Sequence, residues 1–133
     1  NWYWELRKDT DARYREGSVA LLAARAMRAF HEYQPIRRHP LDPERIFQRF
    51  GYGPLLDLFR IDLRSYRGPN SDAQPLELAP ESRILGAAQL DWLQRELARS
   101  RAVWKVIASD MPLGVIVPDD YATGRGAEGI ALR

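Results

Sequence analysis

The sequence predicts an α/β protein, and three stretches in its middle predict that class. Residues 54–63 (PLLDLFRIDL) are apolar at nearly every position, which is typical of an inner strand of an α/β sheet. Residues 86–100 have the apolar spacing of an amphipathic helix, and residues 103–109 (VWKVIAS) are rich in β-branched and aromatic side chains. A strand, a helix and a strand in this order predict a β–α–β unit with parallel strands.

The elements on the amino-terminal side have their own signals. A helix is predicted over residues 18–33, because Ser18 can cap its first turn and Pro35 disfavours helical geometry just beyond its end. Residues 46–50 predict a short strand, and a turn over residues 51–54 would pair it with the apolar strand in a hairpin-like arrangement.

The remaining segments complete the expected order. Residues 65–84 predict a long loop, and residues 113–117 predict a short further strand. The apolar stripe of the second helix is expected to be formed by Ala87, Leu90, Leu93 and Leu97. The chain of 133 residues is long enough for one ordinary domain with a real core, so residues 1–133 are expected to be a single or a partial domain.

Composition excludes several classes of protein. The formal net charge of +2 is small and the sequence has no basic stripe, which argues against a nucleic-acid-binding module. No apolar run approaches the roughly 20 residues of a membrane helix. Without cysteine the chain has no disulfide, thiol catalysis or cysteine-based zinc site. Arginine far outnumbers lysine, which fits either recognition of phosphate and carboxylate groups or the composition of a GC-rich genome.

The two histidines and the aromatic start of the chain are ambiguous. His31 and His39 lack a third ligand at a usual spacing, so surface or helix-end histidines are expected rather than a metal site. Trp2 and Trp4 either contact something outside this chain or cover its own core. Neither end has the pattern of a natural terminus, so we expect a piece of a longer protein.

Polar residues follow both strands of the β–α–β unit. Asp62, Arg64 and Arg67 come after the first strand, and Ser109 and Asp110 come after the second. Parallel strands bring their carboxyl ends to one edge of the sheet, where ligands of open α/β sheets bind, so these residues are expected to converge. From residue types alone, three interpretations stay open: a structural ion pair, an arginine site for an anion such as phosphate, or a metal ligand or acid–base group at Asp110.

Several stretches together resemble one family. They are NWY at the start, EYQPIR at 32–37, YGPLLDLFRIDLRSYRGPN at 52–70 and ILGAAQLDWLQRELARSRAVWKVIASDMP at 84–112. The patterns D-x-R-x-x-R and L-G-x-x-Q-x-x-W-L lie within them. This set resembles the PhoD-like alkaline phosphatase/phosphodiesterase family (alkaline phosphatase D-like), which is a group of calcineurin-like metallophosphoesterases.

The resemblance implies a four-layer α/β/β/α fold in which this chain is the middle of a catalytic domain. It implies a hydrolase that cleaves phosphate mono- or diesters at a metal cluster, with iron and calcium as cofactors, and an extracytoplasmic (periplasmic or secreted) location. The partners would then be a phosphate-ester substrate and the remainder of the same polypeptide. The alternative is an autonomous, non-catalytic binding or interaction domain.

The resemblance also implies roles for individual residues. Asp62 and Asp110 would be catalytic, and Arg64, Arg67 and Arg37 would bind the phosphate. Asn1 resembles a position just after a metal-binding motif and is the candidate metal residue. The family's other metal motifs are absent from the chain, so the piece alone is expected to bind no metal and to be inactive.

Overall fold

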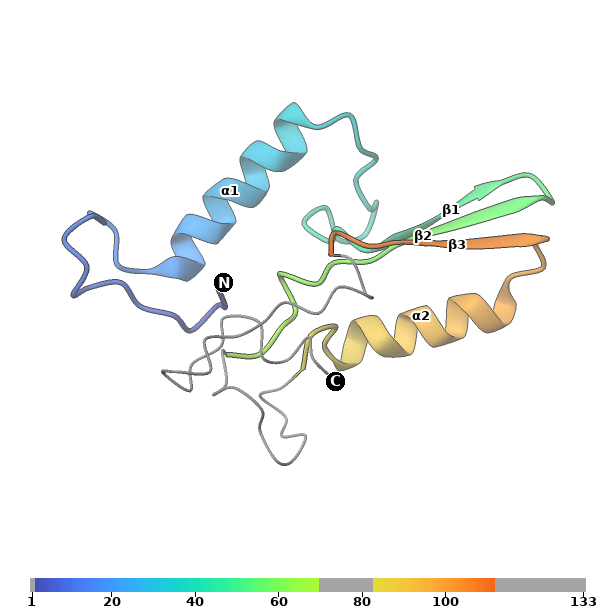
Figure 1. Cartoon of the computed structure of the whole chain (residues 1–133). Helices are drawn as coiled ribbons and strands as arrows, with labels where there is room; N and C mark the ends of the chain where they lie inside the picture. The colour runs from blue at the N-terminus through green and yellow to red at the C-terminus, as the bar shows by residue number, and fades with distance from the viewer. Residues whose placement is uncertain (1, 70–82, 112–133) are drawn as a thin grey trace, which may run out of the picture.

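The part of the chain that the structure describes contains a three-stranded sheet (Figure 1). The structure is a computed structural model that describes residues 2–69 and 83–111. The strands are β1 (Gln48–Tyr52), β2 (Leu56–Arg60) and β3 (Trp104–Ala108), and β2 lies between the other two. Three predictions fall outside the described residues: the metal residue Asn1, the strand over 113–117 and most of the loop over 65–84.

The pairing of the strands confirms both predicted motifs, although β1 lies two residues further along the chain than the strand predicted over 46–50. β1 and β2 are antiparallel, with Phe50 opposite Leu58, and Gly53 has a φ of 62° in the turn between them. β2 and β3 are parallel, with Leu58 beside Val106. The pairing reaches one residue past β2, where the Ile61 N–H donates to the carbonyl of Ala108 at 2.9 Å. The β–α–β unit therefore brings the carboxyl ends of β2 and β3 together.

Two helices accompany the sheet, at the predicted positions. α1 (Val19–Tyr33) begins at Ser18, whose Oγ accepts a hydrogen bond from the Leu21 N–H at 3.3 Å. α2 (Ala87–Arg99) connects β2 to β3 and runs beneath the sheet in Figure 1. In the same view α1 lies above the sheet and is displaced toward the end at which β2 and β3 finish. The described part is thus a mixed α/β arrangement, and the four-layer fold stays a prediction.

The core lies between β2 and α2. Phe59 is fully buried there, together with Ile61 and Leu63 from the chain that continues β2 and Leu93 from α2. Partly buried apolar side chains surround this group: Ile84, Leu85, Trp92, Leu97 and Met111.

The predicted stripe of α2 is partly wrong. Ala87 and Leu90 are exposed, whereas Gln89 and Leu93 are the buried residues of the helix. The helix is rotated relative to its apolar periodicity because Gln89 makes buried hydrogen bonds to the chain that leaves β2. A polar group in a core position is retained only when its hydrogen bonds are satisfied, and here they set the rotation of the helix.

The two faces of β2 differ, which qualifies the prediction of a doubly buried strand. Asp57 and Phe59 on one face are buried, whereas the alternating residues Leu56, Leu58 and Arg60 on the other face are only partly buried. On β3, Trp104 is 69% exposed and Ile107, on the opposite face, is 43% exposed. Parallel strands are normally covered on both faces, and the exposed apolar side chains of β3 depart from that pattern.

A partly buried ion pair joins three elements near the amino end of β2. Arg49 of β1 donates from Nη2 to Asp57 Oδ2 at 2.7 Å and from Nη1 to Glu96 Oε2 of α2 at 3.1 Å. The hydroxyl of Ser100 also donates to Asp57 Oδ2, at 2.5 Å. The hydroxyl of Ser100 and the guanidinium of Arg49 hold the pKa of Asp57 below its usual value, although burial opposes them.

The amino-terminal aromatics cover the chain's own surface. The indole N–H of Trp4 donates to the carbonyl of Ser65 at 2.6 Å, and Trp2 packs against Trp4 with ring centres 5.3 Å apart. His31 is at the end of α1, as predicted, but it is buried rather than at the surface because it packs beside Phe30 and its Nε2 lies 3.5 Å from the carbonyl of Glu44. No helix within residues 2–69 and 83–111 is long and apolar enough to cross a membrane.

Candidate functional site

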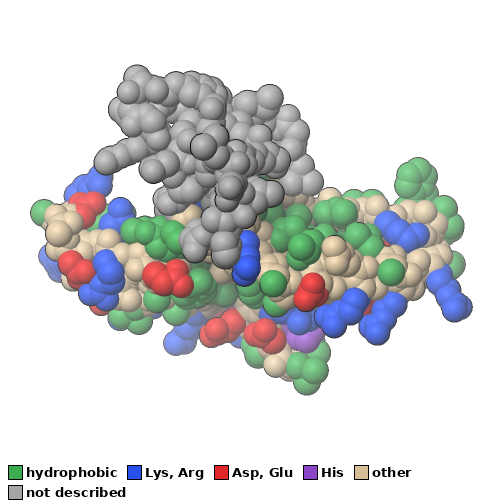
Figure 2. All heavy atoms as spheres, turned by 90° about the horizontal axis from the view of Figure 1, so that it is seen from below, with side chains coloured by type: hydrophobic (Ala, Val, Ile, Leu, Met, Phe, Trp, Pro, Cys, Tyr) green, Lys and Arg blue, Asp and Glu red, His purple; other side chains and the backbone are tan. Residues whose placement is uncertain are grey.

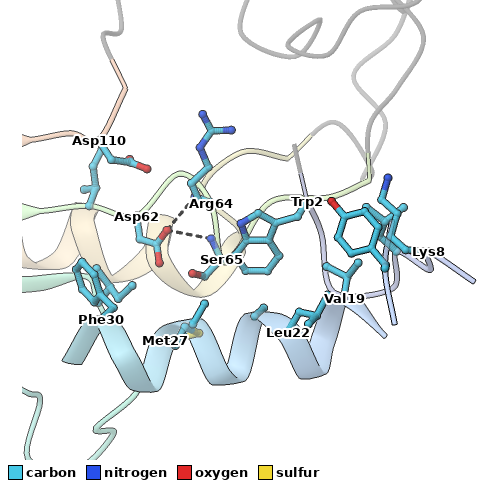
Figure 3. A pocket seen from close by; sticks show the side chains of 16 residues that line it. Trp2, Lys8, Val19, Leu22, Met27, Phe30, Asp62, Arg64, Ser65 and Asp110 are labelled. Carbon is cyan, nitrogen blue, oxygen red and sulfur yellow. Dashed lines mark hydrogen bonds between the residues drawn. The ribbon is translucent and has the colours of Figure 1, made fainter. Parts of the chain in front are cut away.

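A cavity of about 670 Å³ lies where the chain leaves β2 (Figure 3). One wall is the apolar face of α1, which contributes Val19, Leu22, Ala23, Ala26, Met27 and Phe30. A second wall comes from the amino-terminal segment and includes Trp2 and Lys8. The polar wall is formed by Asp62, Arg64 and Ser65 with Asp110 from the end of β3. The cavity therefore has an apolar side and a polar side.

The polar wall is built on a turn with an unusual hydrogen-bond pattern. Four consecutive backbone N–H groups, those of residues 62–65, all donate to side-chain oxygens. The N–H of Asp62 donates to Gln89 Oε1 at 2.8 Å, and that of Leu63 donates to Asp110 Oδ1 at 3.1 Å. The N–H groups of Arg64 and Ser65 donate to Asp62 Oδ1, at 2.8 and 2.9 Å.

The apolar run predicted a strand that ends at Leu63, but β2 ends at Arg60. This hydrogen-bond pattern explains the difference. After residue 61 the backbone donors bond to side chains instead of to the neighbouring strand. The bond from Leu63 to Asp110 also ties the end of β2 to the end of β3. The predicted convergence at one edge of the sheet is confirmed for Asp62, Arg64 and Asp110, which line one cavity, but not for Arg67 or Ser109, which do not line it.

Asp62 is the most constrained residue of this wall. Its side chain lies between those of Asp110 and Ser65 in Figure 3, and the residue is 4% exposed. Oδ1 accepts two hydrogen bonds, whereas the buried Oδ2 has no hydrogen-bond partner among the residues that the structure describes. A buried polar atom without a partner costs about 1–3 kcal/mol, more when charged, so Oδ2 marks a place where a donor would bind favourably.

The negative charge of Asp62 acts on a neighbour. Burial, with a smaller contribution from Asp62, raises the pKa of the Tyr66 hydroxyl to about 12. Tyr66 therefore stays neutral at physiological pH and can act only as a neutral hydrogen-bonding group.

The three candidate arginines lie in different surroundings. Arg64 is half-buried and lines the cavity beside Asp62; in Figure 3 its guanidinium points away from α1. Arg67 is buried and lines a neighbouring hollow of about 420 Å³ with Trp4 and Arg45. Arg37 is exposed in the connector between α1 and β1 and lines neither space. The structure thus brings only Arg64 of the three to the side of Asp62 and Asp110.

The end of β3 contributes one exposed carboxylate. Asp110 is exposed and uses Oδ1 to hold the Leu63 N–H. Ser109 lines neither space, because its hydroxyl bonds to the backbone of Met111. Throughout the described part of the chain, no group of three or more His, Asp or Glu side chains could hold a metal ion. These residues therefore do not form a metal centre by themselves.

The sequence reasoning missed Gln89, which does not line the cavity but bonds to the backbone of Asp62 in its wall. Gln89 is the fully buried residue that holds the backbone of Asp62 from α2. The signal was a glutamine in L-G-x-x-Q-x-x-W-L, adjacent to the apolar stripe of an amphipathic helix. Gly86 of the same pattern has a φ of 72°, and a Cβ there would lie 2.9 Å from the carbonyl oxygen of Tyr66. The pattern therefore lets the start of α2 approach the turn closely.

Charged side chains of both signs lie on the face seen in Figure 2, mixed toward the left and centre and mainly basic toward the right. Several acidic side chains lie next to lysine or arginine side chains in the mixed part. The presence of both signs agrees with the small net charge of +2.

Comparisons with known proteins agree on one family. The model of the PhoD-like phosphatase family matches residues 1–129. Alkaline phosphatase D of Bacillus subtilis (strain 168) is 32% identical over 103 residues, which cover 71% of this chain and 18% of that protein. A solved structure described as "Structure of PhoD" matches with a TM-score of 0.51 and 28% identity, covering 68% of this chain and 19% of that one. The chain thus spans about a fifth of the relatives it matches.

Proposed function

The chain belongs to the PhoD-like phosphatase family, and we propose that its parent protein is a phosphoesterase in which this segment supplies one wall of the substrate site. The observation that carries the proposal is the joint lining of one cavity by Asp62, Arg64 and Asp110, at the carboxyl ends of two parallel strands. Phosphate esters of either type, monoesters or diesters, are the proposed substrates.

Each residue of the wall has a proposed role. The guanidinium of Arg64 binds non-bridging phosphate oxygens, since its planar fork matches them. Asp110 is exposed and keeps one carboxylate oxygen outside its bond to Leu63, so it can exchange a proton with water or with the leaving group. Asp62 holds the backbone of Arg64 through Oδ1, and it lines the cavity beside Arg64 and Asp110. Arg67 and Arg37 stay predicted phosphate contacts, and Asn1 stays a predicted metal residue.

Metal dependence is part of the proposal, with iron and calcium as the metals. Bound to the parent, they would supply an activated water and stabilise charge at phosphorus. The described residues do not make a complete site for them, so we assign no step of Arg64, Asp62 or Asp110 to a metal. An extracytoplasmic location of the parent is proposed on the family resemblance alone.

The test uses the full-length parent and two nitrophenyl substrates, a phosphate monoester and a phosphate diester. We expect hydrolysis of at least one of them and loss of activity after chelation, with recovery when metal is restored. Full activity in metal-free protein would contradict the metal dependence, and no hydrolysis of either ester would contradict the function.

A pair of arginine variants tests the wall itself. Removing one donor to a developing anion costs about 100-fold or more in rate, so Arg64→Ala should lower kcat/KM by that order. Arg95→Ala is the matched control, because Arg95 is exposed on α2 and lines neither cavity. Equal activities of the two variants would exclude Arg64 from the site.

A further inference from the structure

Gln89 is a polar residue in the middle of an apolar contact. It is fully buried, on the face of α2 that packs against the chain leaving β2. Both polar groups of its amide have hydrogen-bond partners. Oε1 accepts from the Asp62 N–H, and Nε2 donates to the carbonyls of Asp62 and Leu85, each at 2.8 Å. Two of these three bonds go to one residue of the cavity wall.

These bonds fix both polar backbone groups of Asp62. Gln89 belongs to α2, and its bond to Leu85 anchors the amide to the residue just before the cap of that helix, so the glutamine connects α2 to the turn at residues 62–65. Asp62 in turn uses Oδ1 to hold the N–H groups of Arg64 and Ser65. The chain of contacts runs from α2 through Gln89 to Asp62 and from there to Arg64.

We propose that Gln89 is a positioning residue of the phosphate-ester site, which sets where the Asp62 carboxylate and the Arg64 side chain lie in the cavity. This inference rests on the proposed function. Gln89 does not line the cavity, so it acts through Asp62 and not on the substrate. Reactive groups must be held within a fraction of an ångström, and a shift of 1 Å can lower a rate by about 100-fold.

A buried polar residue with a purely structural role would bond to groups away from the cavity. Ser100, at the other end of α2, shows what such a role looks like: it is buried and donates to Asp57, which is also paired with Arg49. That group lies away from the residues that line the cavity. Ser100 is therefore the matched control, a buried polar residue of the same helix region that bonds to a buried aspartate of the same strand region.

The experiment compares three variants of the full-length parent. Gln89→Met keeps the length of the side chain but removes all three hydrogen bonds. Gln89→Glu keeps the acceptor for the Asp62 N–H, and as the neutral acid that burial favours it can donate to one of the two carbonyls, so it tests partial rescue by a conservative change. Ser100→Ala removes one buried hydrogen bond at the control position. For each variant we would measure kcat/KM with the nitrophenyl ester, inhibition by inorganic phosphate, the Tm and the exchange rates of the amides of residues 62–65.

The expected order of activity is wild type, then Gln89→Glu, then Gln89→Met, with a loss of about 10- to 100-fold in kcat/KM for the last. Inhibition by inorganic phosphate should weaken in parallel, and the amides of residues 62–65 should exchange faster. Ser100→Ala should lower the Tm while changing kcat/KM by no more than about twofold. Equal changes in kcat/KM for Gln89→Met and Ser100→Ala would overturn the positioning role.

Two outcomes separate this inference from the proposed function. An active wild type in which Gln89→Met keeps normal kinetics overturns the positioning role alone. An inactive wild type overturns the proposed function and, with it, the phosphate-ester role of Gln89. The amide exchange rates then decide the remaining claim, and unchanged exchange at residues 62–65 in Gln89→Met would show that Gln89 does not hold the turn.

Discussion

Two buried aspartates at opposite ends of β2 are held in different ways. Asp57 is 3% exposed, and its Oδ2 accepts from both Arg49 and Ser100. Asp62 is 4% exposed, and its Oδ1 accepts from two backbone N–H groups. Its Oδ2 lies buried without a partner among the described residues, in a side chain that lines a cavity. The two carboxylates are similarly buried, but they differ in the hydrogen-bond partners that offset the cost of removing them from water.

The difference separates a structural charge from a candidate functional one. A buried carboxylate that is paired with a guanidinium and a hydroxyl recovers much of its desolvation cost within the fold. A buried oxygen that is left unpaired keeps that cost until a ligand or another part of the parent supplies a donor. We therefore expect changes at the Asp57 end of β2 to alter stability and changes at the Asp62 end to alter activity.

The largest expected effect comes from Phe59, which lies between the two aspartates and is fully buried in the core. Phe59→Ala should lower the free energy of unfolding by about 3–5 kcal/mol, through lost burial and the cavity it leaves. Chemical denaturation followed by fluorescence would measure this. A loss below about 1 kcal/mol would show that β2 and α2 do not form the core described here.

A smaller effect is expected where α2 approaches the turn at residues 62–65. Gly86→Ala introduces strain at a φ of 72° and a Cβ at 2.9 Å from the carbonyl oxygen of Tyr66. Together these should cost about 1–3 kcal/mol of unfolding free energy and should also lower activity, because the turn must move. Gly53→Ala is the control, since φ is 62° there and no atom lies within 4 Å of the added Cβ. Equal losses of stability and activity in both variants would mean that the close approach is unimportant.

The smallest expected effect is a pH dependence of stability that comes from Asp57. Ser100 and Arg49 lower the pKa of Asp57, so its ionised form stabilises the fold above the unfolded pKa, which is about 3.9. That stabilisation should be fully present at neutral pH and should be lost as the pH falls through the lowered folded value. The difference in stability between wild type and Asp57→Asn should stay constant from neutral pH down to about pH 5 and shrink below about pH 4. A difference that grows on acidification would contradict this pairing.

The sequence predicted the path of the chain better than the details of the site. The parallel pairing of β2 with β3 followed from the apolar run at 55–63 and the helix after it, because local periodicity determines such elements. The capped start of α1 at Ser18 was predictable for the same reason.

What could not be predicted depends on contacts between distant residues. The end of β2 at Arg60 results from the bond between Asp62 and Gln89, which are 27 residues apart. The rotation of α2 has the same cause, since periodicity favours apolar side chains and gives no weight to a buried amide. The separation of Arg64 from Arg67 into two cavities depends on the path of the turn, which the pattern D-x-R-x-x-R does not specify.

The central claim is that the Asp62 end of β2 serves activity and the Asp57 end serves stability. The most direct test is kcat/KM of the full-length parent with a nitrophenyl phosphate ester, compared between Asp62→Asn and Asp57→Asn. Asparagine at position 62 can still accept from the N–H groups of Arg64 and Ser65, so the variant keeps the turn and changes only the charge and the second oxygen. We expect a loss of about 100-fold for Asp62→Asn and a change within about twofold for Asp57→Asn. Near-normal activity of Asp62→Asn beside a large loss in Asp57→Asn would contradict the account.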